Sequence, residues 1–313
     1  MEEPPSETFE RYALGLARRE GLPGEKDREL GQARRQALLA ELLRLGVKGW
    51  PERMTLYTRS LPSGCLPCLE GRGSNLCLTT LCNRECFFCF NPKPRCEGLS
   101  VHGRRVGSEA EIPGILEGLG VRSLGLSGGE PLLDPERVIR IASLVRERLE
   151  GLRVDLYTNG DLLTPELAAR LCKAGVQALR LNLAAGGYRA DPAELALRFF
   201  EDVEVEIPAV PEHRERVLRL MDRLAGIGLR HLVLHELFCS AQNLDALLRR
   251  GYEAKAGPGE ALTWAPVAGS EETALELMLY SLRKDQRLSV YYCSCGTQEW
   301  IARRALERRA AGP

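Results

Sequence analysis

From residue 74 onward, short apolar runs alternate with longer segments whose apolar residues recur at helical spacing. The short runs predict strands, and the longer segments predict helices that cover a parallel sheet. The predicted strands span residues 75–80, 121–126, 153–157, 177–183, 203–208 and 231–236. Six such units predict an α/β fold that forms a partial barrel, in which ligands bind where the strands end.

Four of the predicted helices have readable starts. A capping box begins one of them, and an N-cap residue followed by proline begins the other three. These starts are Ser108 with Glu111, Asp134-Pro135, Thr164-Pro165 and Asp191-Pro192.

Segments outside the alternation predict two extensions. Residues 6–22 and 27–46 read as helices, and residues 53–60 read as a strand. We therefore expect an N-terminal helical extension (1–60), a barrel (61–240), and a C-terminal helical and strand extension (241–313) that closes the barrel mouth.

Three cysteines stand in one loop directly after the first barrel strand. Cys82, Cys86 and Cys89 are separated by gaps of three and two residues. A four-iron cubane has four iron corners, so a loop that supplies three thiolates leaves one iron open to another molecule. The alternatives are three buried structural cysteines and a zinc site, although structural zinc usually takes four ligands from paired elements.

A second motif, Ser127-Gly128-Gly129-Glu130-Pro131, follows the second barrel strand. The two glycines allow a ligand to approach the backbone closely. An ionised Glu130 accepts charge-assisted hydrogen bonds, for example from an ammonium group. Taken alone, this segment is also compatible with an ordinary turn before a helix.

Together the two motifs resemble the radical S-adenosylmethionine (SAM) superfamily. The resemblance implies a partial (β/α)6 TIM-like barrel in which Cys82, Cys86 and Cys89 hold a 4Fe-4S cluster. It also implies that the amino and carboxylate groups of SAM chelate the open iron. Phe88 lies where that superfamily carries an aromatic residue against the cofactor.

Polar residues near later strand ends extend the predicted SAM site. Thr158 and Asn159 end the third strand and can hydrogen-bond a ribose or a carboxylate, although Asn-Gly is also a common turn. Arg180 and Asn182 share one face of the fourth strand, which the resemblance implies in SAM binding. The alternative for both is a salt-bridged or solvent-facing role.

The fifth and sixth strands supply further candidates. Glu206 and Pro208 share a face of the fifth strand, where the superfamily contacts adenine. His235 and Glu236 end the sixth strand, so we expect them near the mouth as proton-transfer or substrate-binding groups. The alternative is a hydrogen-bonded edge histidine. No residue is assigned a catalytic role.

Further motifs resemble a poorly characterised group of the superfamily, described as related to the activating enzyme of pyruvate formate-lyase. The resemblance spans roughly residues 53–310, with departures at Phe90, where the group carries proline, and Cys295, where it carries serine. The motifs are Gly64-Cys65-x-x-Cys68, Glu206-Ile207-Pro208, Glu236-Leu237 with Asn243, Arg250-Gly251-Tyr252, Gly269-Ser270-Glu271-Glu272 and Tyr292-Cys293-Ser294.

Four outer cysteines form a second candidate metal site. Cys65 and Cys68 are a two-gap pair, and Cys293 and Cys295 are a one-gap pair. If the chain ends meet, these thiols can hold an auxiliary iron–sulfur cluster or a structural zinc ion. The alternative is that they are free thiols near the surface.

Composition narrows the choice of partners. Lys plus Arg equals Asp plus Glu at 43 each, so no overall field attracts nucleic acid or an anionic membrane. No apolar run approaches the length of a membrane span, and no basic stretch leads into an apolar one at the start. We therefore expect a cytoplasmic protein whose eleven cysteines serve metal or redox chemistry rather than disulfides.

The resemblance implies that one electron, from a reductant such as flavodoxin or ferredoxin, cleaves SAM to methionine and a 5′-deoxyadenosyl radical. That radical abstracts hydrogen from a substrate. Three interpretations stay open: a modifier of a small molecule or peptide, an activating enzyme that makes a glycyl radical on a partner protein, and a noncatalytic metal-binding or interaction protein. The intact cysteine and glycine motifs argue against the third.

Overall fold

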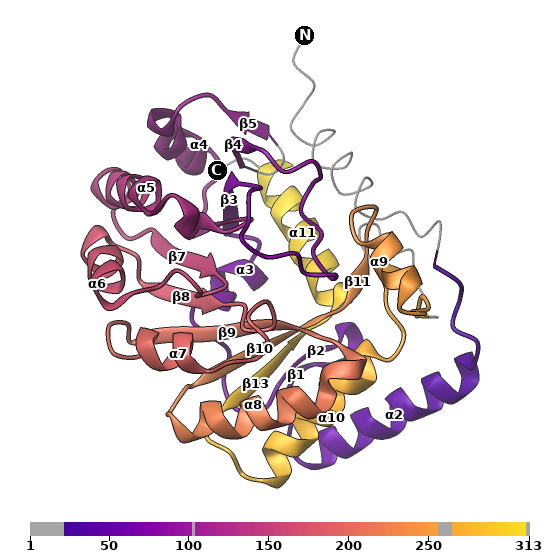
Figure 1. Cartoon of the computed structure of the whole chain (residues 1–313). Coiled ribbons are helices and arrows are strands. Elements are labelled where there is room, and N and C mark those ends of the chain that lie inside the picture. The colour runs from indigo at the N-terminus through magenta and orange to yellow at the C-terminus, as the bar shows by residue number, and fades with distance from the viewer. Residues whose placement is uncertain (1–21, 102–103, 256–264, 311–313) are drawn as a thin grey trace.

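A computed structural model describes residues 22–101, 104–255 and 265–310 (Figure 1). Within these residues, eleven strands form one sheet in the order β1-β2-β13-β10-β9-β8-β7-β6-β3-β4-β5, and β11 pairs with β12. The strands are β1 Lys48–Trp50, β2 Thr55–Tyr57, β3 Gly73–Thr79, β4 Glu97–Val101, β5 Arg104–Val106, β6 Ser123–Gly128, β7 Arg153–Thr158, β8 Ala178–Leu181, β9 Asp202–Ala209, β10 His231–Glu236, β11 Phe238–Cys239, β12 Ala265–Pro266 and β13 Ser289–Cys293.

Seven parallel strands form the middle of the sheet. From β3 through β6, β7, β8, β9 and β10 to β13, each strand pairs with the next one in that series. The first six are the strands that the alternation predicts, and β13 is an additional one. Antiparallel strands extend both edges, β2 and β1 beyond β13 and β4 and β5 beyond β3. The edges β1 and β5 do not pair, so the barrel is partial, as predicted.

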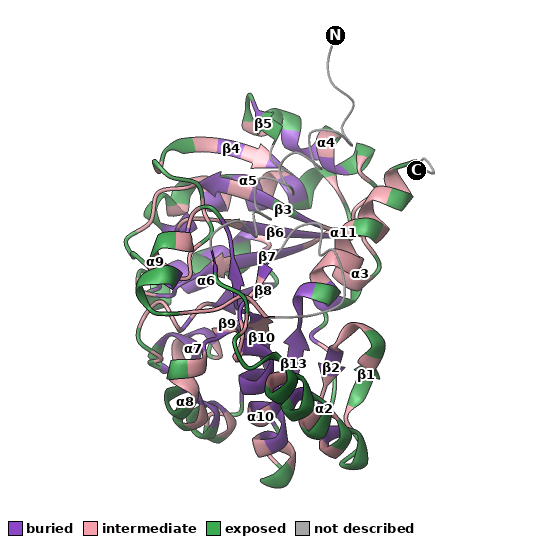
Figure 2. Ribbon diagram, turned by 90° about the vertical axis from the view of Figure 1, so that its right-hand side faces the viewer, coloured by how far each residue is buried: buried purple, intermediate pink, exposed green. Residues whose placement is uncertain are grey.

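Helices cover the outer face of the curved sheet, and the strands they cover are largely buried (Figures 1 and 2). The α-helices are α2 Arg28–Arg44, α3 Cys65–Leu69, α4 Ile112–Gly118, α5 Pro135–Arg148, α6 Pro165–Ala174, α7 Asp191–Ala196, α8 Arg214–Gly226, α9 Leu244–Arg249, α10 Ser270–Arg283 and α11 Cys295–Ala310. Short 3-10 helices are η1 Pro51–Arg53, η2 Glu109–Glu111, η3 Pro131–Leu133 and η4 Pro211–His213.

The barrel strands place apolar and polar side chains on opposite faces. Leu124 and Leu126 of β6 and Val205 of β9 belong to the main apolar core beneath the helices. The alternate positions of the barrel strands, β7 and β8 included, point into the barrel because successive side chains of a strand lie on opposite faces. Two of these positions, Asp155 and Arg180, are bonded to each other across β7 and β8.

Two of the four predicted helix starts are confirmed. The carboxylate of Asp134 accepts a hydrogen bond from the Arg137 amide at 3.0 Å, and the Thr164 hydroxyl accepts one from the Leu167 amide at 3.2 Å. The other two are wrong in detail. Asp191 is the first helical residue rather than the N-cap. The Ser108 hydroxyl bonds the Glu111 carboxylate instead of a backbone amide, and a 3-10 turn precedes α4.

The predicted N-terminal extension is described only in part. The helix expected over 27–46 is α2, and the strand expected over 53–60 is the shorter β2. The helix expected over 6–22 lies, apart from its last residue, outside the described residues. β2 and β13 pair with each other, so segments from both expected extensions join the barrel sheet. The three-part domain division stays a prediction.

Arg35 of α2 provides a test of how the N-terminal helix is held. Its guanidinium lies 3.1 Å from Glu25 and 2.7 Å from Glu272 of α10; Arg35 and Glu272 are buried, and Glu25 is partly buried. We expect Arg35→Met to lower the free energy of unfolding by about 3–5 kcal/mol, since both carboxylates lose a buried cation. The measurement is chemical denaturation followed by circular dichroism.

Arg34→Met is the matched control. Arg34 is the preceding residue and pairs with Glu276 of α10, but its side chain is largely exposed. An exposed pair contributes at most about 1 kcal/mol. Equal losses in the two variants would contradict the assigned role of the buried pair.

Candidate functional site

The loop that carries Cys82, Cys86 and Cys89 begins where β3 ends. All three thiols are half-buried. The Arg84 amide donates a hydrogen bond to the Cys82 sulfur at 3.4 Å. Burial, and then the neighbouring Cys89 and Cys82, raise the pKa of Cys86 to about 12. The structure therefore brings the three thiols together in one loop, and the donor set suits an iron–sulfur cluster.

Residues after β7 hold this loop in place. The side-chain oxygen of Asn83 accepts a hydrogen bond from the Asn159 side-chain amide at 2.7 Å. Arg84 donates two hydrogen bonds to Asp161, at 2.5 and 3.0 Å. Arg95 donates to the Cys82 carbonyl at 3.1 Å. The position of the thiols thus depends on the end of the third barrel strand as well as the first.

The two glycines after β6 allow two backbones to approach. The Gly129 amide donates to the Thr79 carbonyl at 2.7 Å, and the Glu130 amide donates to Leu81 at 2.8 Å. A Cβ on Gly129 would lie 1.9 Å from the Leu81 oxygen, and Gly128 has a φ of +134°. The glycines are therefore required by contact with the start of the cysteine loop, independently of any ligand.

Glu130 is fully buried and accepts hydrogen bonds from three protein donors. These are the Thr158 hydroxyl at 2.7 Å, the Leu132 amide at 2.9 Å and the Asn159 amide at 2.8 Å. Burial raises the pKa of Glu130, and the three donors oppose that rise. The structure thus shows Glu130 tying β6 to β7, while its predicted contact with the SAM ammonium group stays a prediction.

Asn182 and Phe88 also lie at this end of the barrel. The backbone amide of Asn182 donates to the Thr158 carbonyl at 2.9 Å, and the side-chain oxygen of Asn182 is buried with no hydrogen-bond partner among the described residues. A buried acceptor without a partner suits a site that a ligand completes. Phe88 is half-buried against an apolar cluster that includes Leu237, Leu247 and Val267. The Ser127 hydroxyl donates to the Leu76 carbonyl at 3.4 Å.

Arg180 forms salt bridges inside the barrel, which is the alternative to SAM binding given for it above. Its guanidinium donates to Asp155 at 2.8 Å, lies 2.9 Å from Glu204 and also bonds Glu206. Burial acts to raise the pKa of Glu206, but Arg180 and then His235 outweigh it and hold that pKa below its usual range. For Arg180 and Glu206 to contact SAM, this network would have to open. Pro208 is half-buried farther along β9.

His235 and Glu236 point in different directions. The His235 ring lies 3.1 Å from Glu206 through Nε2, so it faces the barrel interior. Glu236 is buried and pairs with Lys255, and its carboxylate accepts a hydrogen bond from the Cys295 amide at 2.8 Å. Glu236 thus lies on the other face of β10 from His235, because successive residues of a strand alternate. Its expected proton-transfer or substrate-binding role stays a prediction.

The structure brings together two of the four outer cysteines. Cys65 and Cys293 belong to one buried cluster with Val233 and Tyr291. Cys68 lies on α3, three residues after Cys65, and burial and then Cys293 raise the pKa of its thiol to about 12. Cys295 lies instead beside Glu236.

Sequence reasoning missed an aromatic group beside the cysteine loop. The Phe87 and Tyr252 rings are stacked with centroids 6.3 Å apart, and the Arg250 guanidinium lies 4.0 Å from the Phe87 centroid. The Tyr188 hydroxyl is 2.9 Å from Nδ1 of His213. Their position in the sequence could have indicated this group, since Tyr188 and His213 follow β8 and β9, and ligands of such barrels bind where the strands end.

Comparison with known proteins identifies the family. The Radical SAM superfamily profile matches residues 76–239, slightly more than half of the chain. The chain belongs to the radical SAM superfamily. Membership implies a 4Fe-4S cluster and SAM, and the three-thiol loop beside Gly128 and Gly129 fits both.

Two relatives are similar over limited parts of their length. A Methanocaldococcus jannaschii protein, provisionally named a glycyl-radical enzyme activating enzyme, is 27% identical over 230 residues, covering 70% of this chain and 60% of the relative. A GTP 3′,8-cyclase of Synechococcus is 35% identical over 129 residues, covering 38% and 36%. This chain thus spans about 60% of the first relative and about a third of the second.

A solved structure supports the fold. Streptococcus suis SuiB, bound to the precursor peptide SuiA, superposes with a TM-score of 0.50 at 14% identity, covering 82% of this chain and 52% of SuiB. At this identity the likeness concerns the barrel architecture alone. Among the described residues, no helix is long and apolar enough to cross a bilayer. The predicted cytoplasmic location stays a prediction.

Gly129→Ala tests the contact between the glycine motif and the cysteine loop. The added Cβ would overlap the Leu81 carbonyl, so either backbone must move. We expect a loss of about 1–3 kcal/mol in stability and of most cluster iron after anaerobic reconstitution. Thermal denaturation and iron analysis measure the two effects.

Gly114→Ala serves as the control. Gly114 lies within α4, where a Cβ would meet nothing within 4 Å. This change should leave the iron content unaltered and stabilise the helix by about 0.5–1 kcal/mol. Full iron binding by Gly129→Ala would show that the close backbone contact is not needed.

Proposed function

We propose that this chain holds a 4Fe-4S cluster through Cys82, Cys86 and Cys89 and uses it to cleave SAM reductively, for hydrogen abstraction from a small molecule or a peptide. The observation that carries the proposal is three gathered thiols beside the Gly128-Gly129 backbone in a radical SAM chain. When bound, the cluster and SAM supply the 5′-deoxyadenosyl radical. The electron comes from a reductant such as flavodoxin or ferredoxin.

The protein's own residues then orient SAM. The side-chain oxygen of Asn182, which has no partner within the described part of the chain, and the hydroxyl of Ser127 lie at the strand ends as hydrogen-bonding groups. Phe88 offers an apolar surface next to the third thiol. Thr158 and Asn159 are already engaged with Glu130, so we assign them the task of keeping the site rigid.

The covering of the site supports a small substrate. Leu237, Leu247 and Val267 form a buried cluster with Phe87 and Phe88 packed against it. The amide of Asn243 also donates to the Phe88 carbonyl at 3.3 Å. A C-terminal segment thus lies directly on the cysteine loop, which narrows access for a folded partner and helps to exclude water from a reactive radical.

We assign substrate binding to the aromatic group beside the cysteine loop, which contains Phe87, Tyr252, Tyr188 and His213. Burial acts to lower the pKa of His213, which keeps the imidazole neutral at neutral pH. The Tyr252 hydroxyl is buried without a hydrogen-bond partner in the described structure. A neutral imidazole and a phenol next to apolar rings suit a substrate that has both polar and apolar parts.

A second candidate is an activating enzyme that forms a glycyl radical on a partner protein. The name of the Methanocaldococcus jannaschii relative favours it. That interpretation requires the partner's loop to reach the cysteine loop past the C-terminal segment that packs on Phe87 and Phe88.

Formation of 5′-deoxyadenosine tests the proposed activity. Anaerobically reconstituted protein with SAM and dithionite should release 5′-deoxyadenosine, and a C82A/C86A/C89A variant should release none because no thiol holds the cluster. Cys172→Ser is the control, since Cys172 is an exposed cysteine of α6. Product from the triple variant at the wild-type rate would exclude this cluster as the source.

Isotope transfer separates the two substrate classes. With a deuterated small molecule or peptide, a modifier should place deuterium in 5′-deoxyadenosine and change the mass of that substrate. An activating enzyme should instead produce a glycyl radical on a partner protein, detected by electron paramagnetic resonance. A protein radical without any change in a small molecule would overturn the small-substrate proposal.

A further inference from the structure

A cavity of about 300 Å³ lies between two neighbouring elements of the barrel. One wall is the loop that follows β8, around Tyr188, and the other is one face of α8. That face carries Arg216, Arg219 and Arg223, and we call the cavity the arginine pocket. The loop and α8 follow the ends of β8 and β9, so the pocket lies at the rim of the barrel mouth.

The three arginines share a face because residues three or four apart on a helix lie on the same side. Like charges at this spacing repel each other and destabilise the helix. Arg223 has a counter-ion, since its Nε lies 2.8 Å from Glu194 of α7. Arg216 and Arg219 form no ion pair within the described part of the chain, and no described residue that lines the pocket is acidic. Two guanidinium charges are therefore uncompensated.

The acidic residues nearest to these arginines in the sequence do not neutralise the pocket. They pair instead with cations that do not line it, namely Glu212 with Arg250, Glu215 with Arg214 and Asp222 with Lys284. The excess of positive charge thus remains in the folded chain.

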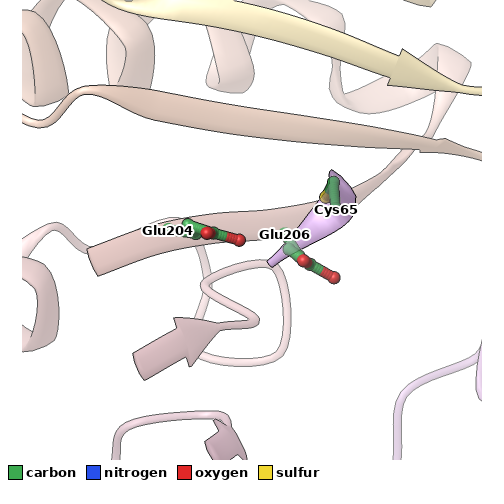
Figure 3. Close-up of side chains that lie close together, drawn as sticks. All are labelled: Cys65, Glu204 and Glu206. Carbon is green, nitrogen blue, oxygen red and sulfur yellow. The ribbon is translucent and has the colours of Figure 1, made fainter. Parts of the chain in front are cut away.

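The arginine inside the barrel differs from these two. Glu204 and Glu206 lie close to the Cys65 sulfur (Figure 3), and Arg180 lies 2.9 Å from Glu204 and also bonds Glu206. Arg180 therefore has its counter-charges within the protein. Arg216 and Arg219 are exposed and lack such counter-charges among the described residues, which leaves them available to an anion from solution.

The charge and shape of the pocket favour phosphate over carboxylate. A guanidinium group is a planar fork of donors that matches two oxygens of a phosphate group. A phosphate monoester carries a charge of about −1.5 to −2 at neutral pH, which matches two uncompensated guanidinium groups. A single carboxylate would balance only one of them.

Tyr188 links the pocket to the aromatic group beside the cysteine loop. Its hydroxyl lies 2.9 Å from Nδ1 of His213, and the His213 ring lies 6.0 Å from that of Phe87, the residue after Cys86. Tyr188 has a φ of +67°, and its amide donates to the Leu183 carbonyl at 2.8 Å. A strained backbone of this kind is characteristic of functional sites. Tyr188 therefore belongs to both the pocket and the aromatic group.

We propose that the arginine pocket binds the phosphate group of a phosphorylated small-molecule substrate. Arg216 and Arg219 hold the phosphate oxygens, and Arg223 adds a third positive charge that Glu194 partly offsets. The organic part of the substrate extends past Tyr188 toward the aromatic group. This inference rests on the proposed function, because it names the class of the substrate.

Calorimetric titration of the C82A/C86A/C89A variant tests the pocket without the cluster. Phenyl phosphate should bind once per chain, and more tightly than inorganic phosphate because its ring contacts the aromatic group. Benzoate, which has the ring but a single negative charge, should bind more weakly than phenyl phosphate. The reconstituted wild type should give the same order of affinities.

Substitutions of the arginines assign the binding to the pocket. Adding R216Q or R219Q should weaken phenyl phosphate binding at least about tenfold, since each removes charge-assisted hydrogen bonds. R219K should weaken it less, because it keeps the charge but loses the fork. R148Q is the matched control, since Arg148 is an exposed arginine at the end of α5, and it should leave the affinity unchanged. Absence of binding, or equal affinities in R219Q and R148Q, would overturn the proposal.

A phosphatase experiment tests whether the phosphate belongs to the substrate. The low-mass fraction of an extract of the source cells should raise 5′-deoxyadenosine formation by the reconstituted wild type, and prior treatment of that fraction with phosphatase should abolish the increase. The R216Q/R219Q variant should require a higher concentration of the fraction. An increase that survives phosphatase, or no increase at all, would overturn the assignment to the substrate. A wild type that never forms 5′-deoxyadenosine while phenyl phosphate still binds would instead contradict the proposed function.

Discussion

The fully buried carboxylate of Glu130 is the interaction on which the mouth of the barrel depends. Three donors from two chain segments converge on it, so the ends of β6 and β7 cannot separate without leaving a buried charge unsatisfied. Asn159, which belongs to the segment after β7, also donates a hydrogen bond to Asn83 in the cysteine loop. One carboxylate thus fixes the third strand relative to the second and, through Asn159, positions the thiols that follow the first.

Inside the barrel, charged side chains rather than a single carboxylate connect the strands. An interior filled by branched apolar side chains is the common solution in closed barrels. Here ion pairs occupy it, with Arg180 between carboxylates of β7 and β9. Such an arrangement is stabilising only when every charge has a partner. α3 brings the Cys65 thiol into the same region, where its sulfur lies 3.8 Å from Arg180.

The sequence predicts local features well and distant pairings poorly. The six barrel strands follow from apolar runs, and the helix starts at Asp134 and Thr164 follow from residues adjacent in the chain. The cysteine loop was predictable because its ligands lie within eight residues. By contrast, the partners of Arg180 come from neighbouring strands in a register that no local pattern reveals. The meeting of His235 with Cys293 depends on β13 joining β10, and β13 lies outside the six-unit alternation.

The place of β13 in the sheet has a consequence for synthesis on the ribosome. This strand of residues 289–293 lies between β10 and β2, so β2 has no neighbour in the main sheet except β1 until residues 289–293 have emerged. The strands β3, β6 and β7, with the cysteine loop, pair much earlier. Because contacts between distant segments form slowly, the nascent chain carries an ordered cysteine loop while the far edge of the same sheet is still unpaired. That edge at β10 is where a chaperone, or a second nascent chain, would meet the unfinished molecule.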